Sequence, residues 1–344
     1  MHQAQAYHYV GLDIHKRTVS YCEKTAAGTS VSRGTNASRA PDLIEWAQSR
    51  PRPWVGAMEA TIFSGWIYDT LAPHAIELHV GHPLRLKAMS KNKSDKIDAE
   101  MLANLLRADL FPSCHMASPQ VRELRRVLRY RNLMVREATR MKNRAAGILM
   151  EIGAEYSKAK LHRKRYFSEL LDGLAEVPSS VLGLLKMTRS NIEVFARAQQ
   201  ELLDALARHD ALSERVARLK TVGGVGDVTA LTWALEIDDP NRFGSIKDVQ
   251  SYCGLCSARH ESAGKERRAP LSKERNPNLQ HILIEAAKLA PANCDYLRRA
   301  RDDALSRGYN RNRATLHVAR KMAAYLLAVD KSSTDFVAPV APET

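Results

Sequence analysis

No proline occurs between Pro119 and Pro178, so nothing in this stretch of the chain interrupts a helix. Within it, apolar residues recur every seven positions: Val127, Met134, Met141 and Ile148. A seven-residue apolar period is typical of a helix that packs along a second helix. Residues 180–216 carry another amphipathic pattern and are expected to form a second helix. We therefore expect residues 118–216 to form a helical, antiparallel, coiled-coil-like connector.

The connector is strongly basic at its start. Residues 121–165 hold 14 Lys or Arg and four Glu. A solvated helix face accounts for such a pattern, and so does a helix that lies along phosphate backbones. The sequence alone leaves both interpretations open.

The sequence pattern before residue 118 is different: short runs of β-branched and aromatic residues alternate with segments of helical period. Two strands separated by a turn after Asp13 are expected in residues 8–22. Further strands are expected in 31–37, 53–59 and 76–83, and helices in 41–50, 65–74 and 94–110. The order βββαβαβα predicts an α/β layer fold for residues 1–117.

Four carboxylates fall at the ends of these elements. Asp13 ends the first strand in GLDIHK, and Glu59 ends a later strand in AMEAT. Asp95 and Asp98 stand three apart at the start of a helix, which places them on one helix face. Such acids repel one another unless divalent cations hold them together. An RNase H-like nuclease uses an acidic cluster built this way to bind the metal ions that promote displacement of the leaving oxygen from a phosphodiester.

Each of these acids also has a purely structural interpretation. Asp95 and Asp98 suit the N-terminus of a helix, where they complement its dipole. Asp13 suits a turn, and Glu59 suits an exposed strand end. The four acids in this order favour the catalytic interpretation.

The overall charge indicates a polyanionic partner. The chain of 344 residues carries 52 Lys and Arg against 38 Asp and Glu, a net charge of +14. Nucleic acid is the commonest reason for such a surplus, although a basic surface also maintains solubility. No signal peptide or membrane-length apolar run is evident, so a cytoplasmic protein with no membrane partner is expected. Five irregularly spaced cysteines do not suggest a disulfide framework.

Residues 217–332 are expected to be mainly helical around a Gly-rich, basic loop. Gly224 and Gly226 in LKTVGGVGDVTALTW fit a helix–hairpin–helix whose backbone amides suit a DNA phosphate. Ser262 lies among small residues and is a candidate nucleophile for a phosphodiester. Four cations follow this serine, and we expect them to contact phosphate: Lys265, Arg267, Arg268 and Lys273. Residues 333–344 are expected to be a disordered tail.

A lone CxxC, Cys253 and Cys256, precedes the serine. Zinc requires a second pair of ligands at suitable spacing, and none is convincing. Cys253 has apolar neighbours, so we interpret it as a core residue.

Taken in order, GLDIHK, MEAT, KSDKIDAEMLA, VGGVGDVTA and YCGL…HESAGK…SK resemble one family. It is the DEDD transposases of the insertion-sequence family numbered 110, together with the Piv-type DNA invertases. The likeness spans nearly the full length, and the middle helices match only in character. It implies an RNase H- or RuvC-like N-terminal domain, a coiled-coil connector and a C-terminal transposase domain.

The resemblance also implies roles. Asp13, Glu59, Asp95 and Asp98 correspond to the DEDD ligands of Mg²⁺ or Mn²⁺, and Ser262 corresponds to the serine that links covalently to DNA. A structured bridge RNA pairs with target and donor DNA in that family. The working form there is a homo-oligomer, a dimer that assembles to a tetramer with active sites shared between subunits.

The sequence departs from the family at a few positions. Ala263 stands where Gly is common after the serine, which affects the placement of Ser262. Thr61 is followed by Ile62, where the family usually has Gly. Gly223 and Gly224 replace a usual Pro-Gly.

Two other functions fit the same sequence. A metal-only RuvC-like junction nuclease needs no serine nucleophile. A non-catalytic helix–hairpin–helix protein needs only the basic surface, but an acidic cluster in such a protein would repel phosphate.

Overall fold

The computed structural model describes residues 8–50, 53–89, 95–174, 176–262 and 265–338, without the side chains of 95–97, 258–262 and 265–269. The chain divides into two compact units, Met1–Arg122 and Glu123–Thr344. The N-terminal unit holds an α/β sheet, and the C-terminal unit is mainly helical. No helix in the described ranges combines the length and the apolarity needed to cross a membrane.

A mixed sheet forms the N-terminal unit, in the order β3-β2-β1-β4-β5-β6. Its strands are β1 His8–Ile14, β2 Thr18–Lys24, β3 Ser30–Ala37, β4 Trp54–Glu59, β5 Glu77–Gly81 and β6 Ser113–Cys114. Strands β1, β2 and β3 are antiparallel neighbours, whereas β4 runs parallel to β1, and β5 runs parallel to β4. The β-branched and aromatic runs of the sequence therefore form strands as expected.

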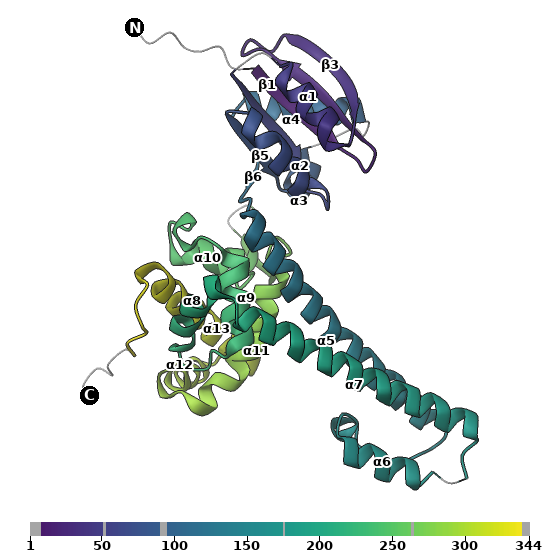
Figure 1. Cartoon of the computed structure of the whole chain (residues 1–344). Coiled ribbons are helices and arrows are strands. Elements are labelled where there is room, and N and C mark those ends of the chain that lie inside the picture. The colour runs from purple at the N-terminus through teal and green to yellow at the C-terminus, as the bar shows by residue number, and fades with distance from the viewer. Residues whose placement is uncertain (1–7, 51–52, 90–94, 175, 263–264, 339–344) are drawn as a thin grey trace. The chain divides into compact units, whose positions relative to one another are not determined.

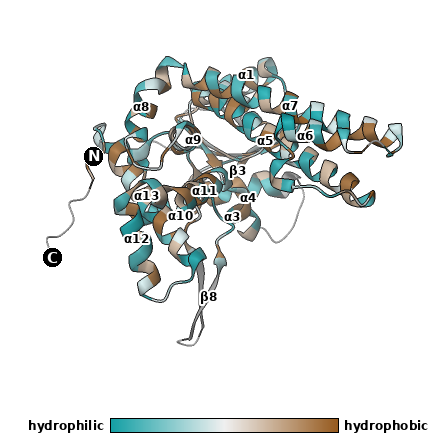
Figure 2. Cartoon of the chain, turned by 90° about the horizontal axis from the view of Figure 1, so that it is seen from below, coloured by the Kyte–Doolittle hydropathy of each residue, from teal (hydrophilic) through white to brown (hydrophobic). Residues whose placement is uncertain are grey.

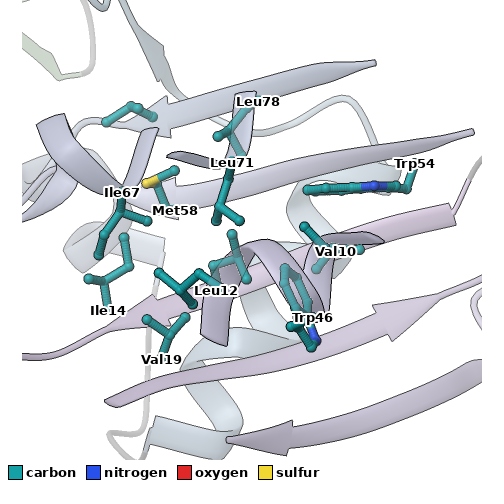
Figure 3. Close-up of a cluster of buried hydrophobic side chains, with 13 residues drawn as sticks. Val10, Leu12, Ile14, Val19, Trp46, Trp54, Met58, Ile67, Leu71 and Leu78 are labelled. Carbon is teal, nitrogen blue, oxygen red and sulfur yellow. The ribbon is translucent and has the colours of Figure 1, made fainter. Parts of the chain in front are cut away.

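Helices cover both faces of this sheet (Figure 1). They are α1 Ala40–Gln48, α2 Ser64–Leu71, the 3₁₀ turn η1 Ala72–His74, α3 Pro83–Met89 and α4 Asp95–Arg107. On one face, Val10 and Leu12 of β1 pack against Trp46 of α1 and Ile67 of α2 in a buried cluster (Figure 3). Because strand side chains alternate, the residues between these core positions point to the opposite face.

Three features of the N-terminal unit differ in detail from the sequence prediction. The strand expected in 76–83 ends at Gly81, and α3 follows directly from Pro83. The two-residue strand β6 was not expected, because so short a segment carries no period. The expected order of strands and helices is otherwise confirmed, so the unit is an α/β fold.

Two long helices form an antiparallel pair in the C-terminal unit (Figure 1). They are α5 Pro119–Glu151 and α7 Ser179–Ala207, and the chain between them holds η2 Lys158–Lys160 and α6 Lys164–Asp172. Near the end of α5, Leu149 shares a buried cluster with Phe167 of α6 and Leu185 of α7. Further along, the side-chain nitrogen of Asn191 lies 3.9 Å from Sδ of Met141.

The rest of this unit contains a helical bundle and a hairpin. Its elements are α8 Asp210–Lys220, α9 Asp227–Ile237, η3 Pro240–Arg242, α10 Ile246–Tyr252, β7 Ser257–Ser262, β8 Lys265–Leu271, α11 Pro277–Asn293, α12 Asp295–Ser306 and α13 Arg311–Ser332. Helix α9 is the centre of the bundle, since every residue from Thr229 to Ile237 is buried.

Two expectations for this region were wrong. Residues 180–216 form two helices with a break at Arg208 and His209, because α8 turns away to pack on α9. The basic loop after α10 is a two-stranded hairpin. In the tail, the Phe336 ring lies 5.2 Å from that of Tyr296, and residues 339–344 lie outside the described residues.

Candidate active site

Two of the predicted carboxylates lie at the ends of neighbouring parallel strands. The last pair in the register of β1 and β4 is Leu12 with Met58, and the next residues are Asp13 and Glu59. Leu12 and Met58 belong to the core on the α1 and α2 side of the sheet. By alternation, Asp13 and Glu59 belong to the other side, where α4 packs.

Helix α4 approaches β1 as closely as a backbone can. A Cβ built on Gly11 would lie 1.9 Å from the carbonyl oxygen of Ala99 and 2.6 Å from the amide nitrogen of Ala103. Only glycine fits between this strand and this helix. Gly11 is two residues before Asp13, so the contact fixes α4 beside the carboxylate end of β1.

The direction of α4 places its first turn at the same edge. At its far end, Nη1 of Arg107 donates to the carbonyl oxygen of Ala26 (3.3 Å), in the turn after β2. Because β2 is antiparallel to β1, this turn lies at the start of β1. The first turn of α4 therefore lies toward the end of β1, where Asp13 is.

The second pair of acids occupies that first turn. Asp95 is the first residue of α4, and its side chain lies outside the described residues. Asp98 is half-buried, Glu59 is exposed, and the Asp13 side chain is 17% exposed. The described side chains do not by themselves include a group of three or more His, Cys, Asp or Glu placed to hold a metal ion.

The residues around Asp13 and Glu59 suit a hard divalent cation in the type of atom they offer. Carboxylate oxygens are the ligands that Mg²⁺ prefers, and no cysteine belongs to this set. The acids also stand at one sheet edge on separate elements, which lets several of them approach one ion. The donor chemistry therefore fits Mg²⁺ or Mn²⁺.

Two neighbours of the acids were missed in the sequence. Nε2 of His15 lies 3.0 Å from Oδ2 of Asp13, two residues along the chain. Past Glu59, Oγ of Ser64 donates to the Glu59 carbonyl oxygen (3.0 Å) and accepts from the Thr61 amide (2.6 Å). The Asp-x-His spacing of GLDIHK was the available signal for His15. Ile62, where the family usually has Gly, is 91% exposed in this turn.

Ser262 closes the β7–β8 hairpin. It is the last residue of β7 and pairs across the ladder with Lys265, the first residue of β8. Arg267 and Arg268 pair with His260 and Arg259 in the same ladder. The backbone therefore brings the serine and three of the predicted cations onto one hairpin, while the intervening Ala263 lies outside the described residues. The exposed Lys273 follows just after β8.

A buried carboxylate joins the base of this hairpin to the long helix α5. Glu236 of α9 is 1% exposed and receives two hydrogen bonds from Arg129 of α5 (2.9 and 2.8 Å). It also accepts from Asn276 (2.8 Å) and Asn278 (2.9 Å), where α11 begins after the hairpin. Burial raises the pKa of Glu236, but the hydrogen bond and charge of Arg129, with Asn276, outweigh it and leave that pKa lowered.

The predicted glycine hairpin lies between α8 and α9. Gly224 has φ +81°, and a Cβ there would lie 2.3 Å from Cβ of Ala290 on α11. The Gly223 amide donates to the Tyr296 hydroxyl (2.7 Å). Gly226 caps α9, and a Cβ there would meet no atom within 4 Å. Packing thus accounts for Gly223 and Gly224, and only Gly226 faces open space.

The five cysteines are free thiols, and none of them belongs to a group of three or more His, Cys, Asp or Glu placed to hold a metal ion among the described residues. Cys253 is fully buried, and burial raises the pKa of its thiol far above the usual range. Its interpretation as a core residue is confirmed.

Comparison with known proteins identifies both units. A DEDD transposase family model of the IS110 group matches residues 10–153, and a model described as "Transposase IS116/IS110/IS902 family" matches 216–303. The chain is 24% identical over 298 residues to the transposase for insertion sequence element IS1328 of Yersinia enterocolitica, covering 83% of this chain and 85% of that protein. It is 26% identical over 239 residues to the transposase for insertion sequence element IS1111A of Coxiella burnetii, covering 67% and 64%. The chain is a DNA transposase and belongs to the IS110 family.

Proposed function

We propose that this transposase cuts and rejoins DNA at a composite site, made of a metal-binding acidic cluster and the nucleophile Ser262. The observation that carries the proposal is the pairing of β1 with β4, which brings Asp13 beside Glu59 on the face where α4 begins. Asp95 and Asp98 would complete the cluster from the first turn of α4. Membership of a transposase family decides against the non-catalytic alternative.

The N-terminal fold supports a RuvC-like domain in residues 1–117. Three antiparallel strands are followed by two parallel ones, and the first acid lies on the central strand β1. The proposed organisation continues with the connector 118–216, the transposase domain 217–332 and the tail 333–344. Arg129 and Glu236 link the second and third of these parts.

Asp13, Glu59, Asp95 and Asp98 would hold Mg²⁺ or Mn²⁺. Such an ion, when bound, supplies positive charge to the oxygens of a scissile phosphate. The chain's own contribution is to fix the acids: the Gly11 contact sets the distance of α4, and His15 restrains the Asp13 carboxylate. A histidine hydrogen bond to a carboxylate holds it in one rotamer.

Ser262 would form the covalent link. Its Oγ attacks phosphorus and loses its proton, the bond from phosphorus to a deoxyribose oxygen breaks, and that oxygen takes up a proton. The phosphoserine keeps the phosphodiester, so the hydroxyl of another strand can displace the serine and complete the joining. Lys265, Arg267, Arg268 and Lys273 would contact phosphates by charge.

Target and donor DNA would be selected by a structured bridge RNA, and a dimer would assemble to a tetramer. The family resemblance supports both statements, and the net charge of +14 suits two polyanionic partners. The amides of the hairpin near Gly224 and Gly226 would add a phosphate contact, for which the open surroundings of Gly226 offer room.

The acidic site is tested with Asp13→Asn and Asp98→Asn in a strand-cleavage assay with Mg²⁺. We expect each to lose at least 100-fold in rate, by about 2.7 kcal/mol or more of transition-state stabilisation. Asp42→Asn is the matched control, since Asp42 is a half-buried acid of the same unit that pairs with Arg39 (2.7 Å). Full activity of both site variants would refute the acidic site.

The serine is tested by trapping on nicked suicide DNA. The wild-type chain should yield a covalent adduct whose phosphopeptide contains Ser262, and Ser262→Ala should yield none. Ser257→Ala, at the other end of β7, is the control. Cleavage at the normal rate by Ser262→Ala would instead support a metal-only junction nuclease. Sequencing the RNA that co-purifies with the chain tests the guide.

A further inference from the structure

A capping hydrogen bond stands at each end of the loop between α12 and α13. Gly308 has φ +79°, and its amide donates to the carbonyl oxygen of Leu305 (2.9 Å) in the last turn of α12. The Asn310 side chain accepts from the amide of Arg313 (2.9 Å) in the first turn of α13. Only Tyr309 stands between the two capping residues. The side chains of this loop therefore start from fixed positions.

This region is dense in arginine, and the ribbon of α12 is mostly hydrophilic in colour (Figure 2). Three arginines pair with nearby carboxylates: Arg298 with Asp295, Arg301 with Asp302 and Arg307 with Asp303. Three others are exposed and form no carboxylate pair within the described part of the chain: Arg299, Arg311 and Arg313. The short stretch thus carries positive charge that no carboxylate of the described residues pairs with.

The electrostatic surroundings of His317, six residues after the start of α13, agree with this surplus. Burial lowers the pKa of His317, and the positive charges of Lys321 and Arg307 lower it further, against an opposing effect of Asp303. Lys321 and Arg307 thus add positive charge to this side of α13.

Tyr309 holds two of the guanidinium groups. The Cζ atom of Arg313 lies 4.5 Å from the centre of the Tyr309 ring, and that of Arg307 lies 5.8 Å away. A guanidinium that stacks on a ring uses its flat face, so the N–H groups at its edge stay available. Those N–H groups match the oxygens of a phosphate in a bidentate contact.

We propose that the segment Arg307–Arg313, the arginine–tyrosine loop, is a binding surface for the phosphodiester backbone of a nucleic acid strand. Arg311 and Arg313 contact phosphates, and Tyr309 fixes the Arg313 guanidinium for that contact. The segment lies outside both matched ranges, 10–153 and 216–303. The proposal rests on the chain acting on nucleic acid and does not require the acidic cluster or Ser262.

The test measures binding of the full-length chain to labelled single-stranded RNA, single-stranded DNA and duplex DNA of one sequence. EDTA is present throughout, so cleavage plays no part. Removal of two phosphate contacts reduces the slope of log K against log salt by about 1.4 for single strands and about 1.8 for duplex DNA. We expect this reduction for Arg311→Gln/Arg313→Gln on the strand that occupies the loop. The polymer that shows it distinguishes RNA from DNA.

The control has the same change of charge. Arg165→Gln/Arg301→Gln removes two guanidinium groups that already pair with Glu169 and Asp302. We expect its salt slopes to match those of the wild-type chain on all three polymers. Equal slopes for the two double variants would overturn the proposal, provided that both melt at the wild-type temperature.

Variants of Tyr309 test the positioning role without any change of charge. Tyr309→Phe keeps the ring and should bind as the wild-type chain does. Tyr309→Leu loses the ring. We expect it to bind several-fold more weakly and to show a smaller slope of log K against log salt, because Arg313 is no longer held for its phosphate contact. Unchanged binding by Tyr309→Leu would refute the role of the ring. Because binding is measured in EDTA, the outcome does not depend on cleavage at the acidic cluster or at Ser262, so failure of this surface and failure of the proposed catalytic site are distinguishable.

Discussion

Gly11 decides how the N-terminal unit holds its acids. It stands where α4 crosses β1, and a side chain there would overlap the backbone of Ala99. We expect Gly11→Ala to lower the free energy of unfolding by roughly 1–3 kcal/mol, as overpacking does. Because the overlap displaces α4 from β1, DNA cleavage should fall as well. Urea denaturation and the cleavage assay measure the two effects.

Gly183 is the matched control for this prediction. It lies within α7, and a Cβ there would meet no atom within 4 Å. Gly183→Ala should stabilise the chain by about 0.4–1 kcal/mol, since alanine restricts the unfolded chain and suits a helix. Equal effects of the two substitutions on stability would show that α4 does not require Gly11.

The ionisation of Glu236 should make the free energy of unfolding depend on pH. Its pKa is lowered in the folded chain, mainly because Arg129 and Asn276 outweigh the effect of burial. The stabilisation is therefore complete above the unfolded pKa of about 4.3 and is lost as the pH falls through the lower folded value. In Glu236→Gln we expect a lower free energy of unfolding at pH 7 and a smaller decrease of that free energy as the pH falls. Urea denaturation between pH 7 and pH 3.5 measures the slopes.

Substitution of the partner, Arg129, should lower the free energy of unfolding at neutral pH. Arg129→Met leaves the Glu236 carboxylate buried without its bidentate partner, at a cost of about 1–3 kcal/mol. The Arg129 side chain is 53% exposed, which reduces the cost below that of a fully buried pair. Identical pH slopes in the wild-type chain and in Glu236→Gln would contradict the assigned cause.

At the scale of elements, periodic patterns were sufficient where one face is buried. The strands before residue 60 and helix α4 follow from alternation and from helical spacing, and the Gly11 contact could not be foreseen because it depends on a tertiary approach. The proline-free stretch gave α5 correctly. The break at His209 was missed, since its cause is the packing of α8 against α9.

The β7–β8 hairpin shows the limit of this method. Its residues SARHES and KERRAPL are polar and charged, without the apolar alternation that predicts a strand. Hydrogen bonds at its base come from residues distant in sequence, such as Arg320, which donates to the Leu255 carbonyl oxygen (2.8 Å). The location of Ser262 on a hairpin therefore could not be read from its neighbours.

The glycine hairpin between α8 and α9 separates packing from binding. Gly224→Ala introduces a Cβ at φ +81° against Ala290, so we expect a loss of stability of about 1–3 kcal/mol. Gly226→Ala meets no neighbour and should leave stability unchanged. If the amides near Gly226 contact a phosphate, its alanine variant should bind DNA several-fold more weakly. Thermal unfolding and a binding titration with duplex DNA distinguish the two effects. Normal binding by Gly226→Ala would show that this glycine does not contact DNA.

At the scale of the whole molecule, the proposed site draws on both compact units. The acids belong to Met1–Arg122, and Ser262 belongs to Glu123–Thr344. Sequence patterns predicted each part separately, because each prediction rests on a local motif. They could not say whether one chain supplies both parts of a working site, since that depends on assembly rather than on local spacing.

Mixing two inactive variants decides this question. In a site shared between subunits, Asp13→Asn supplies an intact serine and Ser262→Ala supplies intact acids. Random mixing then restores about a quarter of the sites, because each part is intact in half of the chains. We therefore expect cleavage to return when the two variants are unfolded and refolded together. Asp13→Asn mixed with Asp98→Asn is the control, which should stay inactive because both changes fall in the same cluster. No recovery in the first mixture, with oligomers of the wild-type size, would mean that each chain builds its own site.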